Sequence, residues 1–266
     1  LVNYHSSALI PTVVHQVESK LPLSVKKEPT VNAKWTYMLY LAGFDVKDVT
    51  MTDLVSGRET LEDINMVVYC GGFSNSDVLG SAKGWAGSFL FNPKAKAALD
   101  NFYAREDTLS LGVCNGCQLM MELGLITPED KKKGKMLHND SHKFESAFLG
   151  VTVPMNRSVM FGSLSGSKLG IWVAHGEGKF SLPYPEDHYN VVLKYSYDEY
   201  PGNPNGSDYS VAGIASQDGR HLAMMPHLER ACFPWENAYY PLDRKDNDQI
   251  TPWMEAFVNA RKCRSS

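Results

Sequence analysis

The sequence lacks an excess of basic residues, because 26 lysines and arginines stand against 30 aspartates and glutamates in 266 residues, with a formal net charge of −4. Proteins that bind nucleic acids or anionic membrane surfaces usually carry a basic excess. The sequence also lacks an apolar run of the roughly 20 residues that a membrane-spanning helix needs. We therefore expect neither a nucleic acid nor a membrane as a partner.

Cysteine is scarce and unevenly spaced, with five residues in the chain, which excludes the disulfide framework of a small secreted protein. Residues 1–16 also lack the basic and apolar regions of a secretory signal. A reducing compartment would keep the cysteines as thiols, so we expect a cytoplasmic location. The hydrophobic content of 43% and the charged content of 21% are those of a globular protein with a sizeable core.

Apolar runs that stop at glycine or at polar turns alternate with helical stretches in the first half of the sequence. Strands are expected at 44–51, 64–70 and 108–113, and an amphipathic helix at 92–104. Such alternation is typical of a parallel sheet covered by helices on both faces. The sequence therefore predicts an α/β fold, a three-layer sandwich with a mostly parallel central sheet.

The second half of the sequence changes to strands with short connections. These strands are expected within 170–182, 189–197, 210–216 and 220–226. Asp218 and Gly219 predict a hairpin between the last two. A closing helix is expected at 251–263, with Thr251 as its N-cap and Pro252 in its first turn.

The stretch "LSLGVCNGCQ" at 109–118 places a cysteine at the turn between a buried strand and a helix. Gly112 and Gly116 flank Cys114 in the order G-x-C-x-G, the cysteine form of the nucleophile elbow, a tight turn that holds the reactive side chain clear of the sheet. The unpaired N–H groups and the positive dipole end of the helix favour the thiolate. Cys114 is therefore the candidate nucleophile.

The second cysteine of the stretch, Cys117, raises two alternatives. A zinc site needs further ligands, and Cys70, Cys232 and Cys263 form no second C-x-x-C or C-x-x-H, so no metal is expected. A thioredoxin-like redox pair would also place C-x-x-C at a helix start and stays open on spacing alone. The flanking glycines favour the elbow over the dithiol, and Cys117 is then expected in the core.

A cysteine nucleophile needs a base, and the base needs a group that orients it. The segment "PHLE" at 226–229 supplies His227 and Glu229, two residues apart and just past an expected strand. Side chains at this spacing in extended backbone leave the same face, so the carboxylate can reach the imidazole while the ring faces a neighbouring strand end. A lone H-x-E is more often an ordinary surface pair, but the elbow favours a catalytic role for this one.

Several longer stretches resemble one protein family: "DVLGSAKGWAGSFLFNP", "LSLGVCNGCQLM", "AHGEGKF", "YPGNPNGS" and "DGRHLAMMPH". They resemble the class I (triad-type) glutamine amidotransferases, and among these the C-terminal glutaminase domains of the large, single-chain phosphoribosylformylglycinamidine synthases. The resemblance runs from about Asp45 to Ala260. It implies a flavodoxin-like α/β fold and a catalytic triad of Cys114, His227 and Glu229.

The resemblance and the chemistry of amide attack identify the other expected site residues. Gln118 and His175 are implied as contacts of the glutamine substrate. Attack on an amide creates an oxyanion that needs two fixed N–H donors. The N–H of Asn115, which follows the nucleophile, would be one donor, and the turn that contains Gly72 and Phe73 would supply the other.

The resemblance implies hydrolysis of glutamine to glutamate and ammonia through a cysteine thioester. The ammonia would pass to synthetase domains of the same or a partner polypeptide, which make formylglycinamidine ribonucleotide with ATP in purine biosynthesis. ATP and magnesium are expected on that synthetase portion and no cofactor on this chain, which has no P-loop motif G-x-x-x-x-G-K-[ST]. Two alternatives stay open: a stand-alone γ-glutamyl thiol hydrolase and a catalytically silent docking module.

The sequence departs from the family in two places. Leu228 stands between the two expected triad residues where the family usually has proline, which leaves their spacing intact. The stretch "VKKEPTVNAKWTYM" at 25–38, aligned without gaps to the family's first strand and turn, keeps few of the family's residues. Because residues 1–30 are also weakly periodic and punctuated by proline, they are interpreted as an N-terminal arm or linker, and 31–266 as one glutaminase domain.

Overall fold

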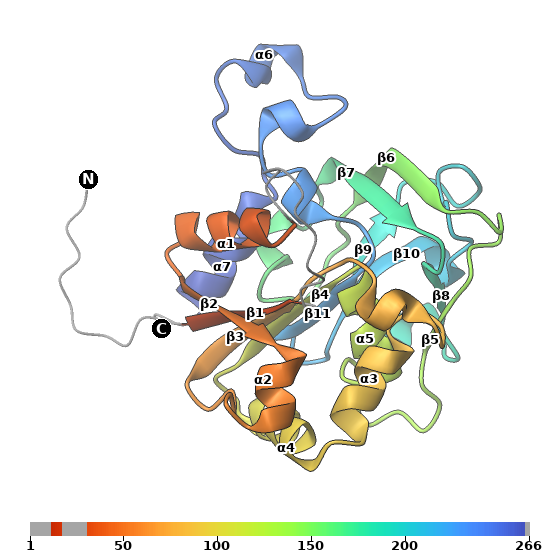
Figure 1. Cartoon of the computed structure of the whole chain (residues 1–266). Coiled ribbons are helices and arrows are strands. Elements are labelled where there is room, and N and C mark those ends of the chain that lie inside the picture. Colours follow the sequence, from red (N-terminus) through yellow and green to blue (C-terminus); the bar gives the residue numbers. More distant parts are fainter. Residues whose placement is uncertain (1–11, 18–30, 264–266) are drawn as a thin grey trace.

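The computed structural model describes residues 12–17 and 31–263. Within these residues, one large sheet is flanked by helices on both faces of its parallel part (Figure 1). The helices α1 (Val31–Leu41) and α7 (Met254–Lys262) lie on one side. The other side carries α2 (Met51–Ser56), α3 (Lys83–Leu90), α4 (Pro93–Ala104) and α5 (Asn115–Glu122). The predicted three-layer α/β fold is confirmed.

Among the described residues, nine strands form the large sheet in the order β2-β1-β3-β4-β11-β10-β9-β6-β7. The first five strands in this order are parallel to one another, as predicted. From β11 onward, each strand pairs antiparallel with the next. The parallel strands are β2 (Asp45–Thr50), β1 (Thr12–Val17), β3 (Ile64–Tyr69), β4 (Leu109–Val113) and β11 (His221–Met224). The antiparallel strands are β10 (Val211–Ala215), β9 (Asn190–Tyr195), β6 (Glu145–Thr152) and β7 (Lys168–His175). A separate small sheet pairs β5 (Lys135–Leu137) with β8 (Lys179–Ser181).

The central strands β3 and β4 form the middle of the core because helices cover both of their faces. Their sequences, "INMVVY" and "LSLGV", are apolar almost throughout, and every residue of β4 is buried. The hydroxyl of Ser110 is the polar exception in β4. It accepts a hydrogen bond from the Tyr103 hydroxyl at 2.9 Å and lies 3.0 Å from Nδ1 of His221, so this buried polar group has partners.

The strand β1 corrects the expected domain boundary at residue 30. Residues 12–17 pair in parallel with β2 on one side and β3 on the other, so these six residues belong to the interior of the sheet and not to an arm or linker. Their sequence "TVVHQV" is rich in β-branched residues, which suit a strand, but it has no alternation of apolar and polar residues. The segment 31–38, part of the stretch that aligns with the family's first strand and turn, belongs to α1. The rest of 1–30 lies outside the described residues.

The helix ends follow local sequence signals. Thr50 and Asp53 form a reciprocal capping box at the start of α2, and Asn92 caps α4 directly before Pro93. The predicted cap of the last helix is also found in part, because the Thr251 hydroxyl accepts a hydrogen bond from the Trp253 amide at 3.3 Å, although the regular helix begins at Met254. No helix within the described ranges has both the length and the apolar character needed to cross a bilayer.

The parallel strands position the candidate site, because their carboxyl ends meet at one edge of the sheet. The strands β3, β4 and β11 are neighbours there. The chain leaves β3 into the turn at 70–73, leaves β4 at Cys114 and leaves β11 toward His227. The predicted hairpin before β11 is present, with β10 and β11 antiparallel. This edge therefore brings together the nucleophile, the base and the glycine-containing turn.

Candidate active site

Cys114 occupies a strained turn between β4 and α5. Its backbone has φ 54° and ψ −108°, a conformation that non-glycine residues rarely adopt and that is concentrated at functional sites. A Cβ atom added at Gly116 would lie 2.0 Å from the carbonyl oxygen of Tyr69, and one added at Gly112 would lie 2.5 Å from Sδ of Met120. The two glycines are therefore required for the close packing of the α5 start against the sheet. This is the strand-to-helix elbow that the G-x-C-x-G pattern predicts.

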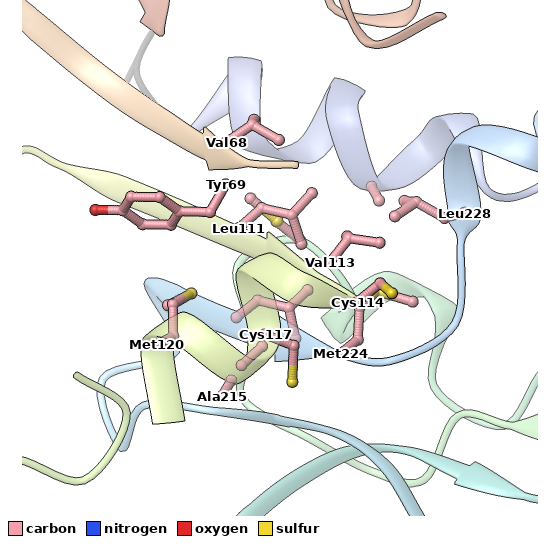
Figure 2. Packing of buried hydrophobic residues seen from close by; sticks show 14 of the residues in the cluster. Val68, Tyr69, Leu111, Val113, Cys114, Cys117, Met120, Ala215, Met224 and Leu228 are labelled. Carbon is pink, nitrogen blue, oxygen red and sulfur yellow. The ribbon is translucent and has the colours of Figure 1, made fainter. Parts of the chain in front are cut away.

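The two cysteines of the C-x-x-C stretch lie in different environments (Figure 2). Cys117 is fully buried, and burial raises the pKa of its thiol well above the usual value. Figure 2 shows it among the packed hydrophobic residues, on the helix that follows Cys114. The sulfur of Cys114 lies 3.6 Å from the carbonyl oxygen of Ala174 and borders a cavity. Cys117 thus has the environment of a core residue, as expected from the sequence.

His227 and Glu229 form a buried pair beside Cys114. Nδ1 of His227 lies 2.6 Å from Oε1 of Glu229, and both side chains are almost wholly inaccessible. The amide of His227 donates to the carbonyl oxygen of Trp172 on β7, which anchors the backbone after β11. The next residues form the short 3₁₀ turn η5 (Leu228–Arg230), which brings the carboxylate back to the imidazole. The Nε2 atom has no hydrogen-bond partner among the described residues and is left for the thiol.

Electrostatics favour the charged form of this pair. Burial lowers the pKa of His227, but the negative charges of Glu229 and Cys114 outweigh burial and raise this pKa to about 9. An imidazolium next to the sulfur favours the thiolate over the thiol. The arrangement therefore places a charged general acid directly beside the nucleophile.

The turn after β3 packs directly against the nucleophile and the base. A Cβ atom added at Gly71 would lie 2.8 Å from Cε1 of His227 and 3.1 Å from Cβ of Cys114, so only glycine fits there. Gly72 has φ 133°, which also requires glycine, and Phe73 follows with an exposed ring. The structure thus brings the two expected oxyanion-turn residues, Gly72 and Phe73, to the rim of the cavity that Cys114 lines.

Asn115 and Gln118 lie on the first turn of α5. The Asn115 side chain is buried, and its Nδ2 donates to Oε1 of Gln118 at 3.0 Å and to Oδ2 of Asp77 at 3.2 Å. The Gln118 side chain donates to the carbonyl oxygen of Glu177 at 2.7 Å. The backbone N–H of Asn115 is in the first turn, where helical amides have no intrahelical acceptor. This N–H is therefore free to serve as a donor next to the nucleophile.

His175 ends β7 and is buried against the same cavity. Burial, followed by repulsion from His227, lowers its pKa to about 3, so the ring is neutral near pH 7. Neither ring nitrogen has a hydrogen-bond partner within the described part of the chain. A buried, neutral imidazole with free nitrogens can accept from or donate to a polar ligand.

The cavity has a volume of about 500 Å³ and is lined by five separate parts of the sequence. Cys114, His227, Gln118, His175, Gly72 and Phe73 all line it, as do Asp77 and Glu177. Sequence reasoning did not select Phe144, Ser146 and Arg230, which also line it. Arg230 could have been noticed as the neighbour of Glu229, from whose Oε1 its Nε lies 3.6 Å. Phe144 and Ser146 had no signal, because only the fold brings the start of β6 to this edge.

The fold and the Cys–His–carboxylate arrangement define a class of protein: the cysteine-dependent hydrolases and transferases whose nucleophile sits at a strand-to-helix elbow of an α/β sheet. Residues 26–263 match the family described as the CobB/CobQ-like glutamine amidotransferase domain. The chain belongs to this family.

Relatives of the chain are considerably longer than the chain itself. The phosphoribosylformylglycinamidine synthase of Drosophila melanogaster is 40% identical over 259 residues, which cover 90% of this chain and 19% of that protein. The protein of the same name in Homo sapiens is 43% identical over 248 residues, covering 84% of this chain and 18% of that protein. An Arabidopsis thaliana relative, named as a probable phosphoribosylformylglycinamidine synthase with the addition "chloroplastic/mitochondrial", is 43% identical over 241 residues. These residues cover 84% of this chain and 17% of that protein. The chain thus spans less than a fifth of the length of these relatives.

Two solved structures share the fold. The structure of PurLQS from Thermotoga maritima superimposes with a TM-score of 0.69 at 24% identity, covering 96% of this chain and 99% of that chain. A glutamine amidotransferase from Thermotoga maritima gives a TM-score of 0.54 at 15% identity, covering 97% and 98%. At these identities the likeness concerns the fold alone.

Proposed function

We propose that this chain hydrolyses glutamine to glutamate and ammonia through a thioester on Cys114. The observation that carries the proposal is the Cys114 elbow beside the buried His227–Glu229 pair, in a chain that belongs to a glutamine amidotransferase family. The cavity of about 500 Å³ is large enough for a glutamine molecule and is bordered by the sulfur.

The first half of the reaction forms the thioester. The Cys114 thiolate attacks the side-chain amide carbon of glutamine, and the carbonyl oxygen becomes an oxyanion. The N–H of Asn115 and an N–H from the turn at 71–73 stabilise this charge; removal of one such donor typically costs about 2.7 to 4 kcal/mol. The His227 imidazolium gives its proton to the departing nitrogen, the carbon–nitrogen bond breaks, and ammonia leaves.

The second half returns the enzyme to its starting state. Neutral His227 removes a proton from a water molecule, the resulting hydroxide attacks the thioester carbon, and the carbon–sulfur bond breaks to give glutamate and the thiolate. Glu229 orients the ring through Nδ1 in both halves and does not itself need to take the proton. The role is supported by burial of the carboxylate and its 2.6 Å separation from the ring.

Two further residues are proposed as glutamine contacts. Gln118 lines the cavity one helical turn after the nucleophile, and its carbonyl and amide groups are fixed by Asn115 and Glu177. His175 borders the cavity as a neutral ring with free nitrogens. No metal ion or cofactor takes part in the proposed chemistry of this chain.

The ammonia is proposed to serve the synthetase that makes formylglycinamidine ribonucleotide in purine biosynthesis. The relatives named phosphoribosylformylglycinamidine synthase support this, because this chain matches only 17–19% of each and the remainder is available for the synthetase step. ATP and magnesium would act on that synthetase portion, in the same polypeptide or a partner. We propose a cytoplasmic location, although the name of the Arabidopsis relative points to organelles in that plant.

The two alternatives are less well supported. A silent docking module would not need the strained elbow or the buried His227–Glu229 pair. A stand-alone γ-glutamyl hydrolase would have the same site, but the named relatives do not favour it.

The test is a comparison of Cys114→Ala with Cys117→Ala in glutamine hydrolysis. Cys114→Ala should abolish glutamate formation, and mass spectrometry of the wild type quenched in acid should detect a glutamyl adduct on Cys114. Cys117→Ala should keep most of the activity, because that thiol is a buried core group. Equal losses from both changes, or hydrolysis that survives Cys114→Ala, would disprove the mechanism.

A further inference from the structure

Three consecutive residues, His175, Gly176 and Glu177, line the candidate active-site cavity. They belong to the turn 175–178, which connects the end of β7 to the start of β8. The carbonyl oxygen of Glu177 accepts the hydrogen bond from the Gln118 side chain at 2.7 Å. The two proposed glutamine contacts, His175 and Gln118, therefore both depend on the position of this turn.

A single residue, Asn139, holds the turn from outside the cavity. Its side-chain Nδ2 donates to the carbonyl oxygen of His175 at 2.8 Å, and its Oδ1 accepts from the amide of Gly178 at 3.0 Å. Its backbone N–H donates to the carbonyl oxygen of Gly176 at 2.9 Å. Three of the four residues in the turn are thus bonded to one fully buried residue. Because a displacement would leave buried polar groups unpaired, these bonds fix the turn in place.

A second buried amide, the side chain of Asn205, supports the far end of the turn. Its Nδ2 donates to the carbonyl oxygen of Gly178 at 2.6 Å. A Cβ atom added at Gly178 would lie 2.5 Å from Nδ1 of His175 and 2.7 Å from Nδ2 of Asn205, so this glycine is packed between the two side chains. The carbonyl oxygen of Asn205 also accepts from the amide of Asp140, the residue after Asn139, at 3.1 Å. The two asparagines therefore form one connected support.

The nucleophile and the base are held by other contacts. The backbone amide of Cys114 donates to β11, and that of His227 donates to β7. Neither Asn139 nor Asn205 is among the described residues that line the cavity, so neither contacts the reacting atoms. Loss of either amide should therefore displace the substrate-facing turn and leave the reactivity of the thiolate unchanged.

We propose that Asn139 is a positioning residue for glutamine binding, and that Asn205 assists it from the other end of the turn. The inference rests on the proposed glutamine hydrolysis. Asn139 sets the place of the His175 ring and of the carbonyl group that holds Gln118, and thereby the fit of the cavity to glutamine. These contacts act on bound glutamine and on the transition state alike, so their loss appears in KM and not in kcat.

The role is tested with Asn139→Ala, which removes both side-chain hydrogen bonds to the turn. The KM for glutamine should rise by at least about tenfold while kcat changes less than about threefold. Asn205→Ala should raise KM by a smaller factor, because it removes one hydrogen bond to the turn.

Asn190→Ala is the matched control for these variants. Asn190 is also a buried amide, which donates to the carbonyl oxygen of Ser216 at 3.1 Å and accepts from the amide of Arg157 at 3.2 Å. It borders a different cavity. The variant should keep the wild-type KM for glutamine even if its Tm falls as far as that of Asn139→Ala.

Two alkylating reagents separate the position of the turn from the reactivity of the nucleophile. Iodoacetamide reports the Cys114 thiolate alone, whereas the chloromethyl ketone analogue of glutamine must first occupy the cavity. In Asn139→Ala, inactivation by a low concentration of the chloromethyl ketone should slow by at least about tenfold, because binding precedes alkylation. The rate with iodoacetamide should stay at the wild-type value, and Asn190→Ala should keep both rates. Equal losses with the two reagents in Asn139→Ala would mean a general loosening of the site and would overturn the inference.

The outcomes distinguish a failure of this inference from a failure of the proposed function. If the wild type hydrolyses glutamine and Cys114→Ala does not, the proposed function stands. If Asn139→Ala then keeps the wild-type KM, or loses kcat at an unchanged KM, the positioning role is wrong. Should Asn139→Ala fail to fold, Asn139→Asp takes its place under the same criteria, because it keeps the acceptor for Gly178 and loses the donor to His175. If glutamine is neither hydrolysed by the wild type nor protects Cys114 from iodoacetamide, the proposed function itself is wrong.

Discussion

At the scale of single residues, Glu229 determines the charge state of the pair that performs the chemistry. Its carboxylate, 2.6 Å from Nδ1, is the main group that raises the pKa of His227 against the opposing effect of burial. Without this charge, the pKa of His227 would be lower, because burial opposes the imidazolium. A buried, hydrogen-bonded carboxylate is thus the condition for a reactive Cys114.

We expect Glu229→Gln to lower kcat for glutamine by at least about tenfold, and His227→Ala to lower it further, because the histidine moves the proton itself. Glu229→Gln should also shift the pH profile of Cys114 alkylation by iodoacetamide toward alkaline pH. The sign follows from the lowered pKa of His227, which withdraws the imidazolium from the thiolate at neutral pH. A variant with the wild-type alkylation profile would show that another group orients and charges the ring.

Gly71 is the residue whose substitution should affect the site with little effect on the fold. An added methyl group would meet Cε1 of His227 at 2.8 Å and Cβ of Cys114 at 3.1 Å, so Gly71→Ala must push the base and nucleophile apart. Misplacement of catalytic groups by about 1 Å can cost roughly 100-fold, and we expect kcat to fall about 10- to 100-fold. Gly162→Ala, where the nearest atom lies at 4.0 Å, is the control and should leave kcat and Tm near the wild-type values.

The residues of the site differ in how far the sequence could predict them. Cys114, His227 and Glu229 could be identified because their neighbours carry local signals: two glycines around the cysteine, and a spacing of two after a strand. The structure brings these three together, and their catalytic roles stay predictions. Phe144 and Ser146 could not be identified, because they reach the cavity only through the pairing of β6 with β7, a contact between distant segments.

At the scale of elements, the close packing of α5 against β3 fixes the nucleophile. We expect Gly116→Ala to lower the free energy of unfolding by about 1–3 kcal/mol or more and to reduce activity, because the added methyl group would lie 2.0 Å from the Tyr69 carbonyl oxygen. Urea unfolding of the variant measures the first effect. Gly87→Ala, inside α3 with its nearest contact at 3.7 Å, should instead stabilise by up to about 1 kcal/mol, as helix propensity predicts. Loss of stability in both variants would point to a general intolerance of the helices and not to the elbow.

The elements also mark the limit of sequence reasoning about the fold. The strands β3 and β4 were predictable because a continuous apolar run ends at glycine or at the elbow, and α4 because Asn92 and Pro93 mark its start. The strand β1 was missed because "TVVHQV" shows no alternation of apolar and polar residues, and three of its six residues, Thr12, His15 and Gln16, are polar. It also lies between stretches that contain proline. Its place between β2 and β3 is set by pairing with strands far along the chain, which local patterns do not report.

At the scale of the whole molecule, two buried histidines make the fold sensitive to acid. Burial, followed by repulsion from His227, lowers the pKa of His175 to about 3. Burial is also the main cause that lowers the pKa of His221 to about 4, where its Nδ1 lies 3.0 Å from the Ser110 hydroxyl. Both rings are therefore held neutral in the folded protein at pH values where exposed histidines are charged.

The sign of the resulting pH dependence follows from proton uptake. In the unfolded chain both histidines bind protons near their ordinary pKa of about 6.5, whereas in the folded chain they resist protonation until about pH 4 or below. The unfolded state thus binds more protons below pH 6.5, and each histidine lowers the free energy of unfolding by up to about 1.4 kcal/mol per pH unit. His227 acts in the opposite direction, because its raised pKa keeps it protonated in the folded state while the unfolded state takes up this proton only near pH 6.5. Its stabilising contribution is complete below about pH 6 and is lost as the pH rises from about 6.5 toward 9.

We therefore expect the free energy of unfolding, measured by urea titration, to fall between about pH 7 and pH 5, with roughly 2 kcal/mol lost for each of the two histidines and part of that sum offset by His227. His221→Asn should lose the share of His221 while keeping that of His175 and the offset of His227, so its stability at pH 7 and at pH 5 should differ by half as much as in the wild type or less. The exposed His142→Asn is the matched control and should keep the full difference. Because His221 lies away from the cavity, the His221→Asn variant should also keep its glutamine hydrolysis at pH 7 wherever it remains folded. An unchanged pH dependence in His221→Asn would mean that the acid sensitivity arises elsewhere and that the buried Ser110–His221 pair accepts a proton without cost to the fold.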